Sequence, residues 1–352
     1  MVKKKKTKTI GVCGVKVPFV YGGAEILCAG LVRRLNEAGY RAELIEAPFG
    51  WWPAESILPN AAAWRMMEFT DPAGKPFDLL ITTKFPSYLI KHPNKVAWLF
   101  HQMRELYDYE IKGGGVFNES LKDNRIREKL IELDRAALRE HKEIFTISGN
   151  VGKRLKKYCG LSSKVLYPPP KLIGRYYSSG YGDYLLYVGR LDPWKRVDLL
   201  IESLSRCRSS ARAVVVGKGD EDKRIRAAVK KYKLQDRVKF YSDISDEKLL
   251  ELYAGARAVY FCPKDEDYGF ITVEAFFSHK PVITAVDSGG PTEFVENGVT
   301  GFVVQPTVED IASAIDKLFG DDTLAKEMGA KAGNNLKHLT WDTVLDRLCG
   351  NI

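Results

Sequence analysis

The sequence lacks the features of membrane-spanning, disulfide-stabilised and zinc-binding proteins. It has no apolar run of the roughly 18–20 residues that a helix needs to cross a bilayer. Its six cysteines form no Cys-x-x-Cys pair and no cluster with His at zinc-site spacing. Lysines open the chain, but no apolar stretch of about 7–15 residues follows them as in a signal peptide. We therefore expect a cytoplasmic protein with reduced, mostly buried thiols and a disordered basic tail over residues 3–8.

Acidic residues are scarce in the first half of the chain. Residues 1–172 contain 29 Lys and Arg against 18 Asp and Glu, a net charge of +11, whereas residues 173–352 contain 25 against 27, a net charge of −2. A basic half predicts an anionic partner, such as a membrane surface, a phosphorylated acceptor or a nucleic acid, although a solvated basic surface explains the excess equally well. No aromatic and basic RNA-binding motif is present, so we expect no nucleic-acid partner.

Short apolar runs with β propensity alternate with helical patterns along most of the chain. The strands predicted in the first half lie at residues 8–15, 41–47, 77–83, 95–100 and 143–148, with helices at 24–39 and 148–160. Either Ser148 or Asn150 caps the second helix. Three consecutive prolines at residues 168–170 predict a stiff linker. The alternation restarts with strands at 183–189, 212–217, 237–241, 256–261, 280–284 and 301–304.

This alternation predicts the α/β class, with two Rossmann-like domains that each carry a parallel sheet. The length of 352 residues also exceeds what one hydrophobic core usually supports. We expect a first domain over residues 1–172, a second over residues 173–335 and a terminal helical segment over residues 336–352. Ligands of such sheets bind at the carboxyl ends of the strands, so two facing domains would hold the site in the cleft between them.

Two strand exits in the second half carry residues suited to phosphate binding. Arg190 and Lys195 follow Gly189 at the end of a predicted strand, and an Arg fork with a Lys point charge suits a diphosphate. Surface cations beside a helix start are the alternative interpretation. Gly217 follows the next strand in half of a dinucleotide fingerprint. Because Asp222 replaces the last glycine of G-x-G-x-x-G, a tight strand-to-helix turn explains Gly217 as well.

The stretch "EDYGFITVEA", which begins at Glu266, predicts a second phosphate site. Gly269 precedes a predicted helix, so the backbone N–H groups of Phe270 and Ile271 would lie unpaired at the positive end of the helix dipole. Glu274, one turn further, could accept two ribose hydroxyls, and Glu266 could reach sugar hydroxyls. A glycosidase pair is disfavoured, because such carboxyls lie roughly 5–9.5 Å apart and eight helical residues span about 12 Å.

Candidate residues in the first half follow the first and fourth predicted strands. Gly22 and Gly23 separate the first strand from its helix, where their peptides could meet phosphate oxygens. His101 follows a strand and therefore lies at the same edge of the sheet. A lone His after a strand is more often structural than catalytic, and both interpretations stay open.

Taken together, these pieces closely resemble the family-4 retaining glycosyltransferases of the GT-B fold. The Arg-x4-Lys pair (Arg190, Lys195) and the Glu-x7-Glu pair (Glu266, Glu274) occur in the family's order and on the expected elements. The resemblance covers nearly the whole chain, densely over residues 184–305. The other matching motifs are "YGGAE", "SGNVGKRLKKYCG", "YPPP", "VGRLDPWKRVDLLIESL", "VVVGKGDE", "PVITAVDSGGPTEFVENGVTGFVV" and "WDTVLDRL".

The resemblance implies a role for each matching residue. Arg190 and Lys195 would neutralise the leaving diphosphate, and Glu266 would contact the donor sugar. The implied catalytic set is Arg190, Lys195, Glu266 and His101. The implied nucleotide-sugar contacts are Gly22, Gly23, Gly189, Gly217, Ile244, Tyr268, Gly269, Phe270, Ile271 and Glu274. The first domain would bind the acceptor, the second the nucleotide sugar, and the terminal helix would cross back to the first domain.

The resemblance also implies the chemistry and the partners. The donor would be a UDP- or GDP-sugar, with no metal and no cofactor, and the anomeric configuration would be retained. The "EDYG" form of the motif is similar to that of mannosyl- and glucosyl-transferring branches. The acceptor would be a glycan, a lipid-linked molecule or a small molecule. A peripheral place at the inner face of an anionic membrane follows from the basic first half.

Two segments depart from the family pattern, and two other functions stay open. Residues 47–69 and 101–120 match no motif, and both lie in the domain that would choose the acceptor. The first alternative is an NAD-dependent oxidoreductase on tandem Rossmann units, which the missing fingerprint disfavours. The second is a catalytically inactive GT-B binding protein, which the intact Arg, Lys and Glu sets disfavour.

Overall fold

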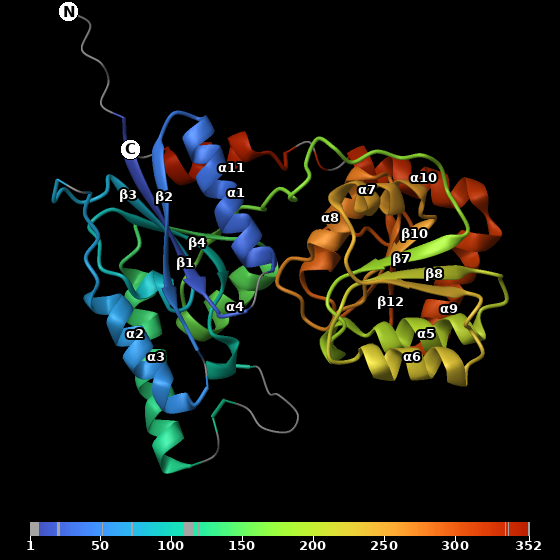
Figure 1. Ribbon diagram of the computed structural model, residues 1–352, viewed down its shortest axis with the longest axis horizontal. Helices are drawn as coiled ribbons and strands as arrows, with labels where there is room; N and C mark the ends of the chain where they lie inside the picture. The colour runs from blue at the N-terminus through green and yellow to red at the C-terminus, as the bar shows by residue number, and fades with distance from the viewer. Residues whose placement is uncertain are drawn as a thin grey trace, which may run out of the picture. The chain divides into compact units, whose positions relative to one another are not determined.

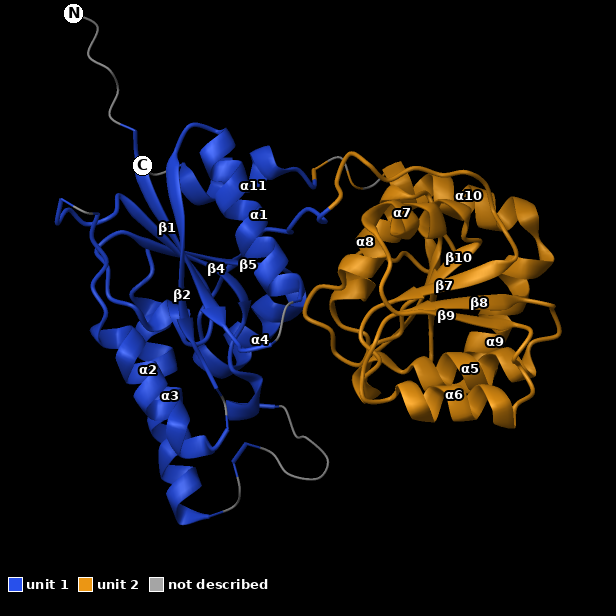
Figure 2. Cartoon of the chain, viewed as in Figure 1, with its two compact units in different colours: residues 1–171, 339–352 blue, residues 172–338 orange. Residues whose placement is uncertain are grey.

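The chain forms two compact units in the computed structural model (Figure 1). One unit consists of residues 1–171 and 339–352, and the other of residues 172–338 (Figure 2). The structure describes residues 7–19, 22–50, 52–71, 73–108, 116–117, 120–334, 336 and 338–350. The part of the predicted basic tail at residues 3–6 lies outside these ranges.

The first unit is built on a parallel sheet with the strand order β2-β1-β3-β4-β5-β6. Its strands are β1 (Thr9–Lys16), β2 (Arg41–Pro48), β3 (Leu79–Lys84), β4 (Lys95–His101), β5 (Glu143–Thr146) and β6 (Lys164–Val165). Its helices are α1 (Gly23–Glu37), α2 (Ala54–Met66), α3 (Leu121–Arg139), α4 (Gly149–Cys159) and α11 (Trp341–Cys349), with short 3-10 turns η1 (Ser87–Leu89) and η2 (Arg104–Leu106). The central strands are buried apolar runs, as expected for a parallel sheet covered on both faces.

Helix α11 completes the first unit although it ends the chain. The Trp341 ring packs edge-on against Trp98 of β4, with the ring centroids 6.4 Å apart. On α1, Gly30 makes room for the same ring, since a Cβ at that position would lie 3.1 Å from it. The indole of Trp98 also donates a hydrogen bond of 2.8 Å to the backbone oxygen of Leu166. Residues from the start, middle and end of the chain therefore share one core.

The second unit has the sheet order β12-β11-β10-β7-β8-β9, again all parallel. Its strands are β7 (Tyr184–Val188), β8 (Arg212–Val216), β9 (Val238–Tyr241), β10 (Ala258–Tyr260), β11 (Val282–Ala285) and β12 (Gly301–Val304). Helices α5 (Val197–Arg206), α6 (Asp222–Lys231) and α9 (Val308–Gly320) cover one face (Figure 1). Helices α7 (Asp246–Gly255), α8 (Phe270–Phe277) and α10 (Asp322–Asn334) cover the other (Figure 1), and the 3-10 turns are η3 (Pro193–Lys195) and η4 (Gly290–Glu293). The predicted α/β class is confirmed.

Two helices of the first unit were not predicted from the sequence. Helix α2 lies in residues 47–69, where Pro59 interrupts the helical pattern, and α3 follows the second unassigned segment. The Ser120 hydroxyl caps α3 by accepting a hydrogen bond from the Asp123 N–H. Of the two predicted caps for α4, Ser148 is the one that accepts the Val151 N–H, and Gly160 ends that helix with φ 69°.

All six cysteines are free thiols, as predicted, and five of them are buried. Burial raises the pKa of Cys28 and of Cys207 to about 12, which keeps both thiols protonated near neutral pH. Across the ranges that the structure describes, no helix combines the length and the apolar character required to cross a membrane.

A buried lysine at the start of β4 depends on one carboxylate. Lys95 is 1% exposed and donates to the backbone oxygen of Ile90 at 2.6 Å and to Glu140 at 3.0 Å. The Arg65 guanidinium also binds Glu140, with Nη1 2.7 Å from Oε2. The hydrogen bond from Arg65 and the charge of Lys95 together lower the pKa of Glu140 to about 2, against the opposing effect of burial. The ionised carboxylate therefore stabilises the fold.

We predict that Glu140→Gln destabilises the first unit by about 1–3 kcal/mol at pH 7, because Lys95 stays buried without its carboxylate. A carboxylate with a lowered folded pKa contributes stability that is present above its ordinary pKa of 4.5 and is lost as the pH falls toward about 2. The variant should thus lose less stability than the wild type between pH 4.5 and pH 2 in urea unfolding.

Glu143→Gln is the matched control, since Glu143 pairs with Lys164, whose side chain is 66% exposed. An equal loss of stability in both variants, with unchanged pH dependence, would contradict this assignment.

Candidate functional site

The sheet of the second unit reverses its order between β7 and β10. Strands β7, β8 and β9 follow one another in one direction, and the chain then returns to β10 on the other side of β7. Such a reversal is the point at which open α/β sheets bind ligands, because the loops on its two sides diverge there. The loops that follow β7 and β10 contain Arg190 and Lys195 on one side and Glu266 on the other.

Lys195 and Glu266 meet at this reversal. The Lys195 ammonium forms an ion pair with the Glu266 carboxylate, and their side chains are 14% and 24% exposed. The Asp192 carboxylate fixes the loop by accepting the N–H groups of Trp194 at 3.0 Å and Lys195 at 3.2 Å. The Arg190 side chain is 78% exposed, and its guanidinium lies 3.8 Å from the Asp192 carboxylate.

Gly269 shapes the start of α8 beside this ion pair. It has φ 87°, and an added Cβ would lie 2.8 Å from Pro291 and 3.1 Å from the Phe261 ring, so only glycine fits. The Lys195 ammonium lies 5.7 Å from the centroid of the same Phe261 ring. In the ranges that the structure describes, the N–H groups of Phe270 and Ile271 have no hydrogen-bond partner. The Phe261 ring therefore lies against both the Lys195 ammonium and Gly269 at the start of α8.

The side chain of Tyr268, one residue before Gly269, is buried. It is 2% exposed and its ring packs edge-on against Phe270 and Phe294, with centroids 4.9 Å and 5.5 Å away. The Gly290 backbone passes so close to Tyr268 that a Cβ on Gly290 would lie 2.4 Å from its carbonyl oxygen. The loop that includes Tyr268 thus packs against the loop after β11.

Glu274 points one oxygen at a buried tyrosine. The Tyr253 hydroxyl donates a hydrogen bond of 2.7 Å to Glu274 Oε2, and Glu274 is half-buried. Burial and the nearby carboxylate raise the pKa of Tyr253, so its hydroxyl remains a donor. Ile244 lies half-buried in the loop between β9 and α7, one residue before the cap of that helix. Glu274 thus lies on the helix that follows β10, and Ile244 lies at the carboxyl end of the edge strand β9.

Two of the predicted glycines allow the ends of the neighbouring strands β7 and β8 to lie close together. Gly189 and Gly217 have φ 146° and 154°, and a Cβ on Gly217 would lie 1.8 Å from the Gly189 carbonyl oxygen. The two segments stay in register because the Gly189 N–H donates to the Val216 oxygen and the Leu191 N–H to the Lys218 oxygen. The half fingerprint at Gly217 is therefore explained by backbone packing of two strand exits.

The candidates of the first unit lie at the carboxyl edge of its own sheet. Gly22 caps α1 and Gly23 is its first residue, and the Gly22 N–H donates to the Glu25 carboxylate at 2.8 Å. The Lys84 ammonium, at the end of β3, binds the same carboxylate at 2.8 Å, and Lys84 pairs in register with His101 at the end of β4. Burial acts to raise the pKa of Glu25, but these hydrogen bonds outweigh it and hold the pKa below its ordinary value.

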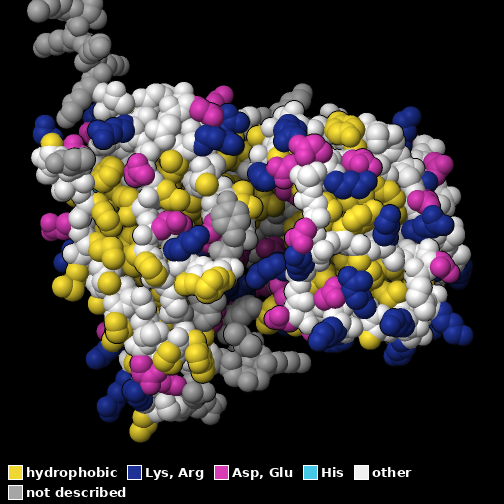
Figure 3. Space-filling model, viewed as in Figure 1, with side chains coloured by type: hydrophobic (Ala, Val, Ile, Leu, Met, Phe, Trp, Pro, Cys, Tyr) yellow, Lys and Arg dark blue, Asp and Glu magenta, His cyan; other side chains and the backbone are white. Residues whose placement is uncertain are grey.

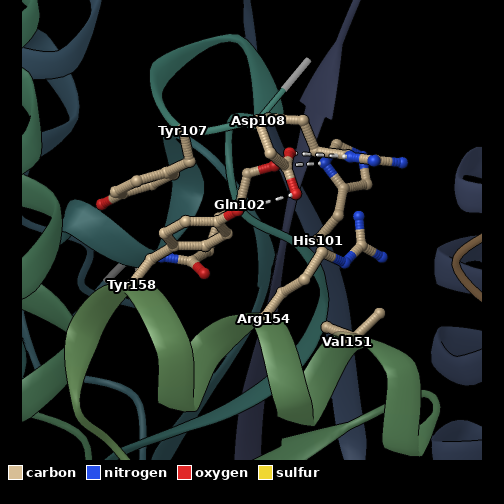
Figure 4. Close-up of a pocket in the computed structure, with 8 residues that line it drawn as sticks. His101, Gln102, Tyr107, Asp108, Val151, Arg154 and Tyr158 are labelled. Carbon is tan, nitrogen blue, oxygen red and sulfur yellow. Dashed lines mark hydrogen bonds and ion pairs between the residues drawn. The ribbon is translucent and has the colours of Figure 1, made fainter. Parts of the chain in front are cut away.

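His101 lines a pocket between the end of β4 and helix α4 (Figure 4). The ring Nδ1 donates to the Gln102 oxygen at 2.7 Å, which fixes the orientation of the ring. Arg154 and Tyr158 project from α4 into the same pocket (Figure 4), where the Tyr158 hydroxyl donates to Asp108 at 3.3 Å. A cation, an imidazole and phenol groups thus face one space.

A buried carboxylate supports the wall of this pocket. Asp134 of α3 is fully buried and accepts hydrogen bonds from Gln102 at 2.8 Å and from the Tyr107 hydroxyl at 2.7 Å. The Tyr88 hydroxyl donates to its other oxygen. Burial raises the pKa of Asp134, although the donors act in the opposite direction. Helix α3, which carries no recognised motif, therefore positions two pocket residues.

The sequence interpretation missed several residues that the structure adds to the site. Glu25 and Lys84 were not predicted, although the spacing from Gly22 to Glu25 is that of a capping box. Arg196 and Asp287 form a bidentate ion pair next to Lys195 with no sequence signal. In the described residues, no group of three or more His, Cys, Asp or Glu side chains is placed to hold a metal ion.

Comparison with known proteins finds similarity to glycosyl transferases. Residues 179–335 match the family described as "Glycosyl transferases group 1". The alpha-1,3/1,6-mannosyltransferase ALG2 of Dictyostelium discoideum is 28% identical over 166 residues, which cover 42% of this chain and 39% of that protein. Sucrose-phosphate synthase from Thermosynechococcus elongatus superposes with a TM-score of 0.77 at 17% identity, covering 97% of both chains. HepE of Anabaena, in complex with UDP and glucose, superposes with a TM-score of 0.71 at 19% identity, covering 97% and 98%.

The second unit of this chain is similar to group 1 glycosyl transferases over residues 179–335, and the chain has the fold of the GT-B glycosyltransferases. The resemblance to family-4 glycosyltransferases and the predicted GT-B fold are thereby confirmed. The family match falls on the unit that holds Lys195, Glu266 and Glu274. The chain matches about two fifths of the length of the mannosyltransferase from Dictyostelium.

Proposed function

We propose that this protein is a retaining glycosyltransferase that moves a hexose from a nucleoside diphosphate sugar to an acceptor hydroxyl. The observation that carries the proposal is the Lys195–Glu266 ion pair beside the N-terminus of α8, at the reversal of a parallel sheet. A lysine and two free backbone N–H groups suit the two negative charges of a diphosphate. A carboxylate at the same point suits the hydroxyls of the sugar.

Donor binding exchanges the partners of Lys195. The diphosphate takes the ammonium and the N–H groups of Phe270 and Ile271, while Glu266 turns its freed oxygens to the sugar hydroxyls. The exposed guanidinium of Arg190 closes on the outer phosphate, because its long side chain has no buried contact to give up. Charge that develops on the leaving diphosphate is thus met by fixed donors, which lowers the barrier to its departure.

The transfer step balances without a protein nucleophile. The bond between the anomeric carbon and the phosphate oxygen breaks, and the acceptor oxygen forms its bond to that carbon from the same face. The acceptor proton passes to the leaving phosphate oxygen, so the nucleoside diphosphate leaves as the conjugate acid. Retention of configuration follows from this same-face geometry, and Lys195 and Arg190 supply charge neutralisation without a metal or a cofactor.

The remaining contacts divide between the two units. Glu274, held by Tyr253, accepts the ribose hydroxyls, and the loop at Ile244 contacts the base of a UDP- or GDP-sugar. The first unit binds a glycan, lipid-linked or small-molecule acceptor, and His101 lies near the transferred sugar. Support for a mannosyl or glucosyl donor comes from the mannosyltransferase relative and from the UDP and glucose bound to HepE.

We further propose that the protein works in the cytoplasm and binds the inner face of an anionic membrane through its basic first half. Residues 1–172 have a net charge of +11. On the face in Figure 3, Lys and Arg side chains are interspersed with Asp and Glu over both units. The attraction is therefore diffuse and should be screened by salt, since the Debye length is about 8 Å at physiological ionic strength.

We predict that one class among UDP-, GDP- and ADP-sugars raises the melting temperature of the protein and is slowly hydrolysed. At a ligand concentration of about 100 times Kd the stabilisation is about 2.7 kcal/mol, equivalent to roughly 5–10 °C for a unit of this size. Glu274→Gln should reduce this shift by more than half, because the amide offers the ribose one acceptor in place of two.

Glu309→Gln, an exposed change on α9, is the matched control and should leave the shift intact. Stabilisation by NAD and by none of the nucleotide sugars would favour the oxidoreductase. Stabilisation by a nucleotide sugar without hydrolysis or transfer to any acceptor would favour an inactive binding protein.

We predict salt-sensitive flotation with vesicles that contain anionic lipid. At about 50 mM salt most of the protein should float with them, and at about 500 mM most should remain below, because screening removes a diffuse attraction. Zwitterionic vesicles are the control and should bind little at either salt concentration. Absence of binding to anionic vesicles at low salt would contradict the membrane proposal and leave the glycosyl-transfer proposal unaffected.

A further inference from the structure

Arg196 adopts a backbone conformation that side chains normally avoid. Its φ of 52° and ψ of 42° place it in the left-handed region, between η3 and the first residue of α5. A non-glycine residue in this region costs roughly 1–2 kcal/mol, so the surrounding contacts must fix it there. Lys195, the residue immediately before it, forms the ion pair with Glu266.

A bidentate ion pair holds Arg196 in this conformation. Its Nη1 lies 2.7 Å from Asp287 Oδ1 and its Nη2 lies 2.6 Å from Asp287 Oδ2, while its side chain is 17% exposed. The Tyr260 hydroxyl, at the end of β10, donates to the Arg196 carbonyl oxygen at 2.9 Å. Side chain and backbone of Arg196 are therefore both anchored, and two parallel hydrogen bonds fix the guanidinium plane.

The partner carboxylate belongs to the loop that supports Glu266. The Asp265 N–H donates to the Asp287 carbonyl oxygen at 2.8 Å, and the Glu266 N–H donates to the Ser288 oxygen at 2.9 Å. The loop after β7, the loop after β10 and the loop after β11 thus meet at Arg196 and Asp287. The ion pair joins the residue after Lys195 to the segment that carries the backbone of Glu266.

We propose that Arg196 and Asp287 are positioning residues that hold Lys195 and Glu266 at the spacing that glycosyl transfer requires. This inference rests on the proposed function. The Arg196 guanidinium is paired with Asp287. Arg196 therefore acts on the reaction through the position of its backbone and not as a second cation for the diphosphate. Releasing the pair loosens the Lys195 loop against the Glu266 loop, because the backbone hydrogen bond from the Lys264 N–H to the Trp194 oxygen at 2.8 Å is then left to hold them together beside the Lys195–Glu266 pair itself. Turnover should then fall more than donor affinity, because Glu274 and the N–H groups of α8 remain in place.

Arg196→Gly separates this role from a role in folding. Glycine enters the left-handed region at little cost, so the backbone strain is relieved while the ion pair is removed. We expect a melting temperature within a few degrees of the wild type, a donor Kd within about 3-fold, and kcat lower by about 10–100-fold. Arg196→Lys keeps the charge but only one hydrogen bond to Asp287, so its kcat should lie between those of the wild type and Arg196→Gly.

Charge reversal supplies the rescue. Arg196→Asp alone places two carboxylates together and should lower kcat at least as far as Arg196→Gly. Combining it with Asp287→Arg restores an ion pair of opposite direction, and we expect kcat to recover at least 3-fold. Arg212→Ala is the matched control, because Arg212 pairs with Asp183 in the same unit through side chains that are 58% and 67% exposed.

Hydrogen–deuterium exchange tests the inference independently of activity. In Arg196→Gly, amides of both residues 193–197 and residues 264–269 should exchange about 10-fold faster than in the wild type, and Arg212→Ala should change neither. Faster exchange confined to residues 193–197, or an unchanged kcat in an active enzyme, would overturn the inference. A wild type that neither binds nor turns over nucleotide sugars would refute the proposed function instead, and the exchange result would still decide whether one ion pair couples the two loops.

Discussion

The arrangement of the site in the second unit depends on the ion pair between Lys195 and Glu266. This ion pair joins loops that follow two neighbouring strands, and Phe261 packs against both Lys195 and Gly269 beside it. Lys195 is held by Asp192 and by the anchored backbone of Arg196, and Glu266 by the loop after β11. Charges that are mostly withdrawn from solvent interact more strongly than surface charges, so a diphosphate that replaces Glu266 gains a preorganised cation.

The second unit was largely predictable because its chemistry coincides with local sequence signals. Each strand is a short apolar run, and Gly269 marks the start of α8, where the structure places a left-handed residue before free N–H groups. The pairing of Lys195 with Glu266 could not be read from spacing, since the two are 71 positions apart. That contact follows from β10 lying beside β7, which depends on the order of strands in the sheet.

The first unit was less predictable, for physical reasons that its residues make plain. Helix α2 includes Pro59 and a poorly amphipathic sequence, so its helical pattern is weak. Helix α3 matters because Asp134 supports the pocket of His101, and a buried carboxylate in a helix carries no motif. Lys84 and Glu25 meet because β3 neighbours β1 and β4 in the sheet. The role of Arg196 was not predictable either, because the sequence "WKRVD" contains no signal for an arginine with left-handed backbone angles.

The most direct test is the affinity of the protein for a nucleoside diphosphate when Glu266 is neutralised. Isothermal titration of UDP and GDP into Glu266→Gln should show binding about 3–10-fold tighter than in the wild type, because Lys195 no longer has to leave a carboxylate and a negative charge near the diphosphate is gone. Sugar transfer by the same variant should fall. Weaker binding in Glu266→Gln, or unchanged binding in Lys195→Ala, would contradict the claim that the diphosphate takes the place of Glu266 on Lys195.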